Sequence, residues 1–466
     1  MVAWPHSSSR ALDPGADQGS GPFGLVLTFY QRDPAYALGL ASLSAYAKRE
    51  LADLRVHLVP IFRDDPVEKT VALIRELRPD LIAVSAMSPT WLPSDPYLRA
   101  LRAELPATPV VVGGYQAIVS PDETIRHPAV DYVCVGDGEE PLVALIRRLR
   151  AEAPPSDEPI PGLWAKDADG TIRKTQPVLV RDLTELPFPD YSIFARPGGL
   201  HYLSPRAIQS PRLTTVPVLS GRGCPYRCSY CANTTLLDLF GMKSGFLRKF
   251  DPGALVAELA RLRERYTIDY FQFWDEEFLY DMRYARTLLG QYRAQVGLPF
   301  SMFVRVENMS EELCALAAEA GCHSMWFGIE SGSESYRREY LHRRMSNDVI
   351  VAAAEQAQRH GIKRFCFNMV GLPFETRPNI DETLALSRAI APELTVFSQF
   401  LPLTGTPLYE LCRQHELLLP PSPEQQMWPL GRLNIKEHPG GISNRAMSEV
   451  AVEIMRYLDD TNRLDA

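Results

Sequence analysis

The sequence predicts an α/β protein in which a doubly wound, Rossmann-like domain is followed by a (β/α)6 partial barrel. Short apolar runs alternate with amphipathic segments from Gly24 to about Arg150, and a second alternation of the same kind begins at Thr215. Strands that alternate with helices form parallel sheets covered by those helices. The length of 466 residues fits two or three domains with large cores.

The first alternation comprises five strand-like runs and five helices. Strands are expected at Leu25–Tyr30, Val56–Ile61, Leu81–Ala86, Val110–Val112 and Tyr132–Val135. Helices are expected at Ala37–Arg49, Pro66–Leu77, about Pro96–Glu104 and, as the fifth, Glu139–Glu152. A doubly wound sheet binds its ligand in the crevice at the carboxyl ends of its strands.

The second alternation comprises six β/α units. Strands are expected at Val216–Ser220, Tyr270–Trp274, Phe300–Val304, Ser324–Ile329, Phe365–Val370 and Thr395–Leu401. Helices are expected at Pro252–Tyr266, Met282–Val296, Ser310–Ala320, Ser346–His360 and Arg377–Ile390. Six units are too few for a closed eight-stranded barrel, so we expect a partial barrel with its chemistry at the carboxyl strand ends.

Changes of pattern divide the chain into five segments. They are a disordered N-terminus at 1–22, the Rossmann-like domain at 23–151, a linker at 152–214, the partial barrel at 215–408 and a C-terminal helical and loop extension at 409–466. The linker contains one predicted hairpin, Leu163–Lys174, which turns at Asp169-Gly170. Two further helices are predicted, Pro407–Gln414 across the start of the extension and Asn444–Leu458 within it.

Composition and charge limit the cellular compartment and the kinds of partner that we expect for this protein. The net charge of −8 argues against a nucleic-acid surface, because binding to phosphates needs clustered Lys and Arg. No window is as apolar as a membrane span, and residues 1–22 lack the apolar core of a signal peptide. Five of the eight cysteines are scattered without the spacing of a disulfide framework. We therefore expect a cytoplasmic protein without nucleic-acid or membrane partners.

The remaining three cysteines lie in the loop Gly221–Cys231, which directly follows the first strand of the predicted barrel. Cys224, Cys228 and Cys231 have the spacing C-x3-C-x2-C. Cuboidal iron–sulfur clusters usually take four thiolates, so three leave one iron open for a ligand from outside the protein. An open metal position is typical of a catalytic site. The pattern predicts a 4Fe-4S cluster with these three cysteines as its ligands.

The two simpler interpretations of the loop are a structural zinc site and inert core cysteines. A structural zinc site needs four ligands, and no histidine occurs between His201 and His323 to complete one. Inert core cysteines occur singly more often than as three thiols within eight residues of a Gly, Pro and Arg loop. Both interpretations rank below the cluster.

The loop resembles that of radical S-adenosylmethionine (SAM) enzymes, which share its Ser-Tyr-Cys ending at Cys231. Later strand ends also match this superfamily, and the resemblance covers about residues 24–410. It implies a (β/α)6 barrel whose cluster holds SAM and cleaves it reductively to a 5′-deoxyadenosyl radical. It also implies an external electron donor such as flavodoxin or ferredoxin.

The same resemblance implies a set of SAM contacts at strand ends. The acidic run after Phe273 offers one carboxylate for the amino group of SAM, and Arg305 offers a planar fork for a carboxylate or a helix cap. Glu375 is expected either to cap the following helix or to touch the cofactor. The expected SAM-binding residues are Tyr230, Asp275 or Glu276, Arg305, Glu330, Ser331, Val370 and Gly371.

The N-terminal domain resembles the cobalamin-binding domain that precedes many radical SAM enzymes. Matching fragments are Leu38–Leu43, Ser85–Thr90, Val111–Gly114 and Asp131–Pro141. Paired glycines allow the backbone to approach a flat ligand closely. The expected cobalamin-binding residues are Ser85, Ser88, Thr90, Gly113 and Gly114. The loop Tyr30–Tyr36 lacks the cobalt-ligating histidine of methionine-synthase domains. A flavodoxin-like domain without its cofactor therefore remains the alternative.

The expected function is reductive SAM cleavage coupled to cobalamin-dependent methyl transfer to an unactivated centre of a small-molecule or natural-product substrate. Two alternatives keep the cluster without methyl transfer, namely transfer of the 3-amino-3-carboxypropyl group of SAM and a radical rearrangement or cyclisation. A redox or light sensor is a third, non-enzymatic alternative. The full set of SAM-binding strand ends argues against it, because a sensor does not need to bind SAM.

Overall fold

The chain forms two compact units. The computed structural model describes residues 23–31, 37–150, 158–196, 199–200, 214–242, 246–278, 280–422 and 430–462. Unit 1 comprises Met1–Val180 and Pro187–Ser204, and unit 2 comprises Arg181–Leu186 and Pro205–Ala466. The expected disordered segment 1–22 and residues 32–36 of the loop after the first strand lie outside the described residues.

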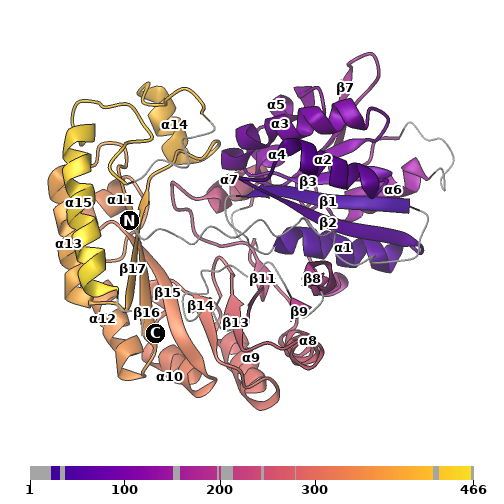
Figure 1. The fold of residues 1–466 in the computed structure, drawn as a ribbon. Coiled ribbons are helices and arrows are strands. Elements are labelled where there is room, and N and C mark those ends of the chain that lie inside the picture. Colours follow the sequence, from indigo (N-terminus) through magenta and orange to yellow (C-terminus); the bar gives the residue numbers. More distant parts are fainter. Residues whose placement is uncertain are drawn as a thin grey trace. The chain divides into compact units, whose positions relative to one another are not determined.

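Unit 1 is built on a seven-stranded sheet with the strand order β2-β1-β3-β4-β5-β6-β7 (Figure 1). The first five strands pair in parallel, and β6 and β7 are antiparallel. The strands are β1 (Phe23–Gln31), β2 (Leu54–Phe62), β3 (Leu81–Ser85), β4 (Val110–Gly113), β5 (Tyr132–Cys134), β6 (Leu163–Lys166) and β7 (Ile172–Arg173). The helices are α1 (Leu38–Glu50), α2 (Val67–Glu76), α3 (Ser88–Glu104), α4 (Tyr115–Val119), α5 (Pro121–Arg126) and α6 (Glu139–Leu149).

Helices cover both faces of this sheet, which is the predicted doubly wound arrangement. Helices α1 and α6 pack together on one face, while α2 to α5 lie on the other (Figure 1). Residues 23–29 of β1 are all buried, because a central parallel strand is enclosed from both sides. The five predicted strands are confirmed to within about two residues at each end.

Three features of unit 1 differ from the sequence expectation. The predicted hairpin forms, but β6 pairs with β5 and so extends the first sheet beyond residue 151. Helix α3 starts at Ser88 because the Thr90 hydroxyl bonds the backbone of Met87, and the helix then continues through Pro93 and Pro96. Between β4 and β5 the chain forms α4 and α5, two short helices whose bounds were not predicted.

Unit 2 is built on six strands in the order β10-β13-β14-β15-β16-β17, all parallel, which is the predicted partial barrel (Figure 1). The strands are β10 (Thr215–Val218), β13 (Tyr270–Phe273), β14 (Phe300–Phe303), β15 (Cys322–Glu330), β16 (Lys363–Val370) and β17 (Leu394–Gln399). The helices are α7 (Ala232–Leu239), α8 (Pro252–Arg265), α9 (Met282–Gln295), α10 (Glu311–Glu319), α11 (Glu334–Glu339), α12 (Asn347–Arg359), α13 (Arg377–Ile390), α14 (Pro407–Gln414) and α15 (Asn444–Thr461). Short elements are β8 (Ala195–Arg196) and β9 (Gly199–Leu200) in unit 1, and β11 (Gly221–Arg222) and β12 (Arg248–Lys249) in unit 2.

The C-terminal helix extends the outer helical layer of unit 2. In α15, the Tyr457 ring lies 6.2 Å from the Phe397 ring of β17. Asn462 then accepts a hydrogen bond from the backbone N–H of Thr395 (2.9 Å) and donates one to its carbonyl (3.0 Å). Among the described residues, no helix combines the length and the apolar character needed to cross a bilayer.

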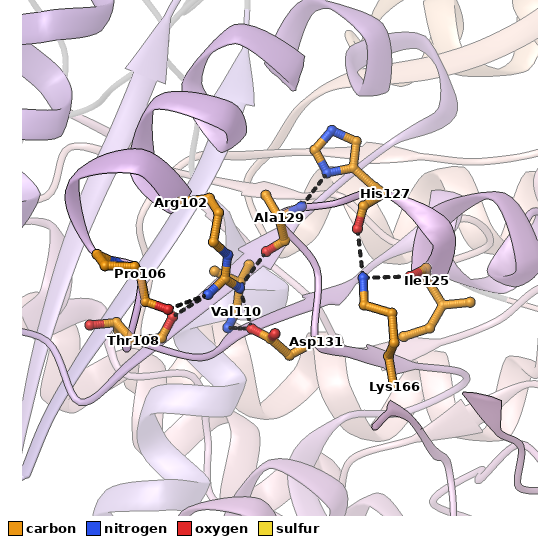
Figure 2. A network of polar contacts seen from close by, with 9 residues as sticks. All are labelled: Arg102, Pro106, Thr108, Val110, Ile125, His127, Ala129, Asp131 and Lys166. Atoms are coloured by element: carbon orange, nitrogen blue, oxygen red, sulfur yellow. Dashed lines mark hydrogen bonds and ion pairs between the residues drawn. The ribbon is translucent and has the colours of Figure 1, made fainter. Parts of the chain in front are cut away.

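A polar network fixes the amino ends of β4 and β5 in unit 1 (Figure 2). Arg102 of α3 donates to the Asp131 carboxylate (2.5 Å) and to the Ala129 carbonyl (2.9 Å). The same carboxylate accepts the backbone N–H of Val110 (2.8 Å). Lys166 of β6 donates to the carbonyl of His127 (2.9 Å), so the hairpin is bonded to the loop before β5. One guanidinium thus connects α3 with both strand beginnings.

This network gives a prediction for the stability of unit 1. Arg102→Ala leaves the partly buried Asp131 carboxylate without its strongest donor, so the free energy of unfolding should fall by about 1–3 kcal/mol. Arg99→Ala on the same helix is the matched control, since Arg99 is 59 % exposed in its ion pair with Asp95 and its loss should cost less than about 0.5 kcal/mol. Urea titration followed by circular dichroism compares them, and equal effects would contradict this role for Arg102.

Candidate functional site

The cysteine loop is shaped by two glycines and a short pair of antiparallel strands. Gly221 and Arg222 form β11, which pairs with β12 in antiparallel fashion. A Cβ on Gly221 would lie 2.3 Å from the Arg248 carbonyl oxygen, so only glycine permits this pairing. Gly223 has φ +91°, and a Cβ there would lie 2.3 Å from the Phe246 carbonyl oxygen. The loop is therefore held close to residues 246–249 just before its first cysteine.

The three thiols of the loop form no disulfide, and two of them are buried. Cys224 and Cys228 are each 8 % exposed, and Cys231 is partly exposed. Burial raises the pKa of Cys224 to about 12 and that of Cys231 to about 11, so metal binding has to displace thiol protons. Helix α7 starts directly after Cys231, and its N-terminal end favours negative charge at that position.

The arrangement of the thiols bears on the zinc alternative. Among residues with described positions, no three Cys, His, Asp or Glu side chains converge as ligands of a single metal ion would. A tetrahedral zinc site requires such convergence. The preference for a cluster over zinc therefore continues to rest on the C-x3-C-x2-C spacing of the three cysteines.

The acidic run after β13 places its three carboxylates in different environments. Asp275 is buried and accepts hydrogen bonds from the Ser220 N–H (2.9 Å) and hydroxyl (2.5 Å). Lys249 of β12 donates to the same carboxylate (2.9 Å) and to the backbone carbonyl of Glu277 (3.0 Å). Asp275 therefore anchors the base of the cysteine loop, and of the two residues expected to meet the amino group of SAM, Asp275 or Glu276, it is the one already bonded within the protein. Glu276 is exposed, while Glu277 is fully buried, and burial raises the pKa of its carboxyl to about 7.

Glu330 ends β15 beside Tyr230, the second residue of the Ser-Tyr-Cys tripeptide. Its Oε1 accepts hydrogen bonds from the Tyr230 hydroxyl (3.0 Å) and from Arg343 (3.2 Å), and Arg343 also bonds that hydroxyl (3.1 Å). Glu330 has φ +69°, and a Cβ on Gly328 would lie 2.1 Å from its Oε1. Burial raises the pKa of Glu330, although Arg343 opposes that shift. One carboxylate oxygen is left for a ligand hydroxyl.

Other expected SAM contacts are engaged within the protein. The Val370 carbonyl accepts the backbone N–H of Phe400 (2.8 Å), and the Gly371 N–H donates to Glu375 (2.7 Å). Ser331 is fully buried, and its hydroxyl accepts the backbone N–H of Ser333 (3.4 Å). Glu375 holds the turn at Gly371 by its Oε2 and does not cap α13. These groups shape the strand ends, and their expected contacts with SAM stay predictions.

Arg305 at the end of β14 is held by three partners. Its Nη1 donates to the Cys228 sulfur (3.3 Å), and its Nη2 pairs with Glu307 (2.5 Å). The guanidinium carbon lies 3.8 Å from the centre of the Tyr226 ring. The guanidinium of Arg305 is therefore directed at a cysteine and an internal glutamate, and its expected contact with a SAM carboxylate stays a prediction.

The expected cobalamin crevice lies at the carboxyl ends of β1, β3 and β4. Ser88 has a buried hydroxyl, and Gln31 a buried amide oxygen, that lack hydrogen-bond partners in the described part of the chain, which suits a polar ligand. The Thr90 hydroxyl already forms hydrogen bonds with the backbone of Met87. Gly113 has space, since an added Cβ would meet only the Cys134 Cβ at 3.8 Å.

The backbone conformation explains why position 114 is a glycine. Its φ is +85°, and an added Cβ would lie 2.7 Å from the Ala86 carbonyl oxygen and 3.2 Å from the Ser85 hydroxyl. The Gln116 N–H bonds the same Ala86 carbonyl (3.0 Å). The fold therefore requires glycine here whether or not a ligand approaches, and the expected contact of Gly114 with cobalamin stays a prediction.

Lys249 and Arg343 belong to the site but were not predicted from the sequence. Each is distant in sequence from the carboxylate it binds, and neither falls in a recognisable motif. A single basic residue in a loop carries no signal of its partner. Their pairing with Asp275 and Glu330 becomes visible only in the folded chain, where the strand ends lie side by side.

Comparison with known protein families matches the two units to two domain models. A model described as the B12 binding domain matches residues 26–146, and one described as the radical SAM superfamily matches residues 218–387. The chain is a radical SAM superfamily member with a B12-binding domain. Its cofactors are therefore a 4Fe-4S cluster, SAM and cobalamin, as predicted.

Several curated proteins are similar to this radical SAM chain. A protein of Pyrococcus horikoshii named as an uncharacterised methyltransferase is 25 % identical, over 82 % of this chain and 79 % of its own length. Cytidylyl-2-hydroxyethylphosphonate methyltransferase of Streptomyces wedmorensis is 26 % identical, over 72 % and 69 %. Anaerobic magnesium-protoporphyrin IX monomethyl ester cyclase of Cereibacter sphaeroides is 24 % identical, over 74 % and 55 %.

Two solved structures share the fold. The radical SAM methyltransferase TsrM of Kitasatospora setae, solved with tryptophan and a SAM analogue, has a TM-score of 0.65 at 20 % identity, covering 84 % of this chain and 76 % of that one. The cobalamin-dependent radical enzyme OxsB, solved with aqua-cobalamin and SAM, has a TM-score of 0.69 at 16 % identity, covering 94 % and 67 %. They confirm the predicted succession of an α/β domain and a partial barrel.

Glu375 gives a prediction about pH dependence. Its carboxyl is fully buried, and burial raises its pKa to about 8 from the ordinary value near 4.5. The folded state therefore binds this proton more tightly than the unfolded chain. Its contribution to stability is complete below about pH 4.5 and is lost as the pH rises through about 8, by up to about 1.4 kcal/mol per pH unit.

Glu375→Gln should flatten this slope, because an amide oxygen can still accept the Gly371 N–H but carries no titrating proton. The measurement is the free energy of unfolding from urea titrations between pH 5 and pH 8. Glu319→Gln, at a 64 % exposed position on α10, is the control and should retain the native slope. A native slope in Glu375→Gln would show that this carboxyl is ionised in the folded protein.

Proposed function

We propose that this chain is a cobalamin-dependent radical SAM methyltransferase that acts on a small-molecule or natural-product substrate. The observation that carries the proposal is the three-cysteine loop at the carboxyl end of the first barrel strand, in a chain that also has a B12-binding domain. Curated relatives that are named as methyltransferases support the transfer of a methyl group.

Each domain has a separate task in this proposal. Unit 1 binds cobalamin at the carboxyl ends of its strands, where Ser88 and Gln31 offer unpaired polar atoms and Gly113 leaves space. Unit 2 holds the cluster by Cys224, Cys228 and Cys231. When bound, these cofactors and SAM supply a low-potential electron, a radical precursor and a carrier for the methyl group.

The remaining residues of the site position SAM and exclude water. Glu330 accepts a hydroxyl of the SAM ribose with the oxygen that Tyr230 and Arg343 leave free. Glu276, exposed beside the anchored Asp275, meets the amino group of SAM. The positive Arg343 keeps the buried Glu330 carboxylate paired before the ligand arrives, so less reorganisation is needed on binding. A small electron-transfer protein such as flavodoxin or ferredoxin supplies the electron.

Ring formation is the second candidate. It is favoured by one observation, that two curated relatives, from Cereibacter sphaeroides and Rubrivivax gelatinosus, are named as cyclases. This chain spans 55 % and 59 % of their lengths. A cyclase would consume SAM without producing S-adenosylhomocysteine.

Product analysis of SAM separates the candidates before any substrate is known. Protein reconstituted with iron, sulfide and hydroxocobalamin is incubated with SAM and a strong reductant, and nucleoside products are identified by mass spectrometry. We expect about one cobalt per chain, 5′-deoxyadenosine, and S-adenosylhomocysteine that depends on added cobalamin. 5′-Methylthioadenosine formed without cobalamin would instead support aminocarboxypropyl transfer and contradict the proposal.

Gly113→Val is the matched variant for the role of cobalamin. It adds two methyl groups at the end of β4 without a backbone clash, unlike a substitution at Gly114. Cobalt content and S-adenosylhomocysteine should fall at least tenfold, while 5′-deoxyadenosine formation and iron content stay native, because the cluster belongs to unit 2. Native cobalt content in this variant would contradict the assigned crevice.

A further inference from the structure

Arg305 has an arrangement that the expected binding of SAM does not explain. Its Nη1 lies 3.3 Å from the Cys228 sulfur, while Nη2 is fixed by Glu307 at 2.5 Å. The guanidinium plane is supported by the Tyr226 ring at 3.8 Å. Since Tyr226 lies between Cys224 and Cys228 in the loop, the loop itself supplies one of the surfaces that orient the arginine.

These contacts leave the guanidinium little freedom. The Arg305 side chain is 12 % exposed and that of Glu307 is 28 % exposed. Asn308, in the same short helical turn as Glu307 (Val306–Asn308), donates to the Tyr226 hydroxyl (3.4 Å). The turn after β14 and the cysteine loop are thus bonded to each other on both sides of the arginine. A permanent positive charge is held against one sulfur of the proposed cluster.

A cation at a cluster thiolate has a definite electrostatic effect. Reduction adds one negative charge to the cluster, and a donor N–H that points at a ligand sulfur stabilises the more negative state. The effect is larger where water is excluded, because screening is weaker there. Arginine keeps its charge at every accessible pH, so the effect is constant.

We propose that Arg305 is a positioning residue that raises the reduction potential of the cluster by its hydrogen bond to Cys228. This inference rests on the proposed function, since it requires the cluster on the three-cysteine loop. It assigns Arg305 to the electron-transfer step and leaves binding of SAM to Glu276 and Glu330. Tyr226 and Glu307 act by orienting the guanidinium.

The test is a redox titration of the reconstituted full chain without SAM or cobalamin, followed by electron paramagnetic resonance of the reduced cluster. Arg305→Gln should lower the equilibrium constant for one-electron reduction about tenfold, which is about 59 mV toward more negative potential. Arg305→Lys should shift the potential less, because it keeps the charge but cannot bond Cys228 and Glu307 together. Arg227→Gln, a 46 % exposed arginine next to Cys228 in sequence, controls for charge alone and should shift it least.

Each outcome of the redox titration supports or overturns the inference about Arg305. An Arg305→Gln variant with native iron content and native potential, or with the same shift as Arg227→Gln, would overturn the inference. If Arg305→Gln takes up no iron, Arg305→Lys decides: a more negative potential supports the inference, and a native potential overturns it. If neither variant binds iron, Arg305 holds the cluster and does not tune it. Native protein that binds no iron would contradict the proposed function and the inference with it.

Discussion

The ion pair between Lys249 and the buried Asp275 is the interaction on which the site depends. Asp275 is 2 % exposed and bonds both the N–H and the hydroxyl of Ser220, the last residue before the cysteine loop. Lys249 joins the same carboxylate to two carbonyls of the β13 loop. Removing one partner of a buried pair costs roughly 3–5 kcal/mol, because the other charge stays uncompensated. The ends of β10, β12 and β13 are therefore fixed together before any cofactor binds.

Other charged residues of the site are also bonded within the protein. Glu375 fixes the turn after β16 through the Gly371 N–H, and Arg343 fixes Glu330 at the end of β15. Several carboxylates expected to meet ligands thus serve the protein itself. In unit 2 we propose that the described groups that meet ligands are one oxygen of Glu330, the exposed Glu276 and the three thiols. A site of this kind is preorganised, because the groups that touch the ligand are held by groups that do not.

The fold was largely predictable from the sequence, while the partners of site residues were not. Apolar runs such as Leu25–Tyr30 become strands because burial on both faces leaves no alternative, and six such runs gave the partial barrel. Helix α3 was predicted eight residues short, because proline is a helix breaker by local rules and the Thr90 cap overrides it here. The hairpin was placed correctly, but its pairing with β5 is a long-range contact that local pattern does not encode. For the same reason the contact between Arg305 and Cys228, which lie 77 positions apart in the sequence, could not be predicted.

The iron content of the protein shows whether Cys224, Cys228 and Cys231 hold the cluster. The measurement is iron per chain after anaerobic reconstitution of the native protein and of the variant with all three cysteines changed to alanine. We expect about four irons in the native chain and none in the variant, with loss of the visible absorption of the cluster. If the triple variant keeps its iron and its colour, the metal lies elsewhere and these cysteines are not its ligands.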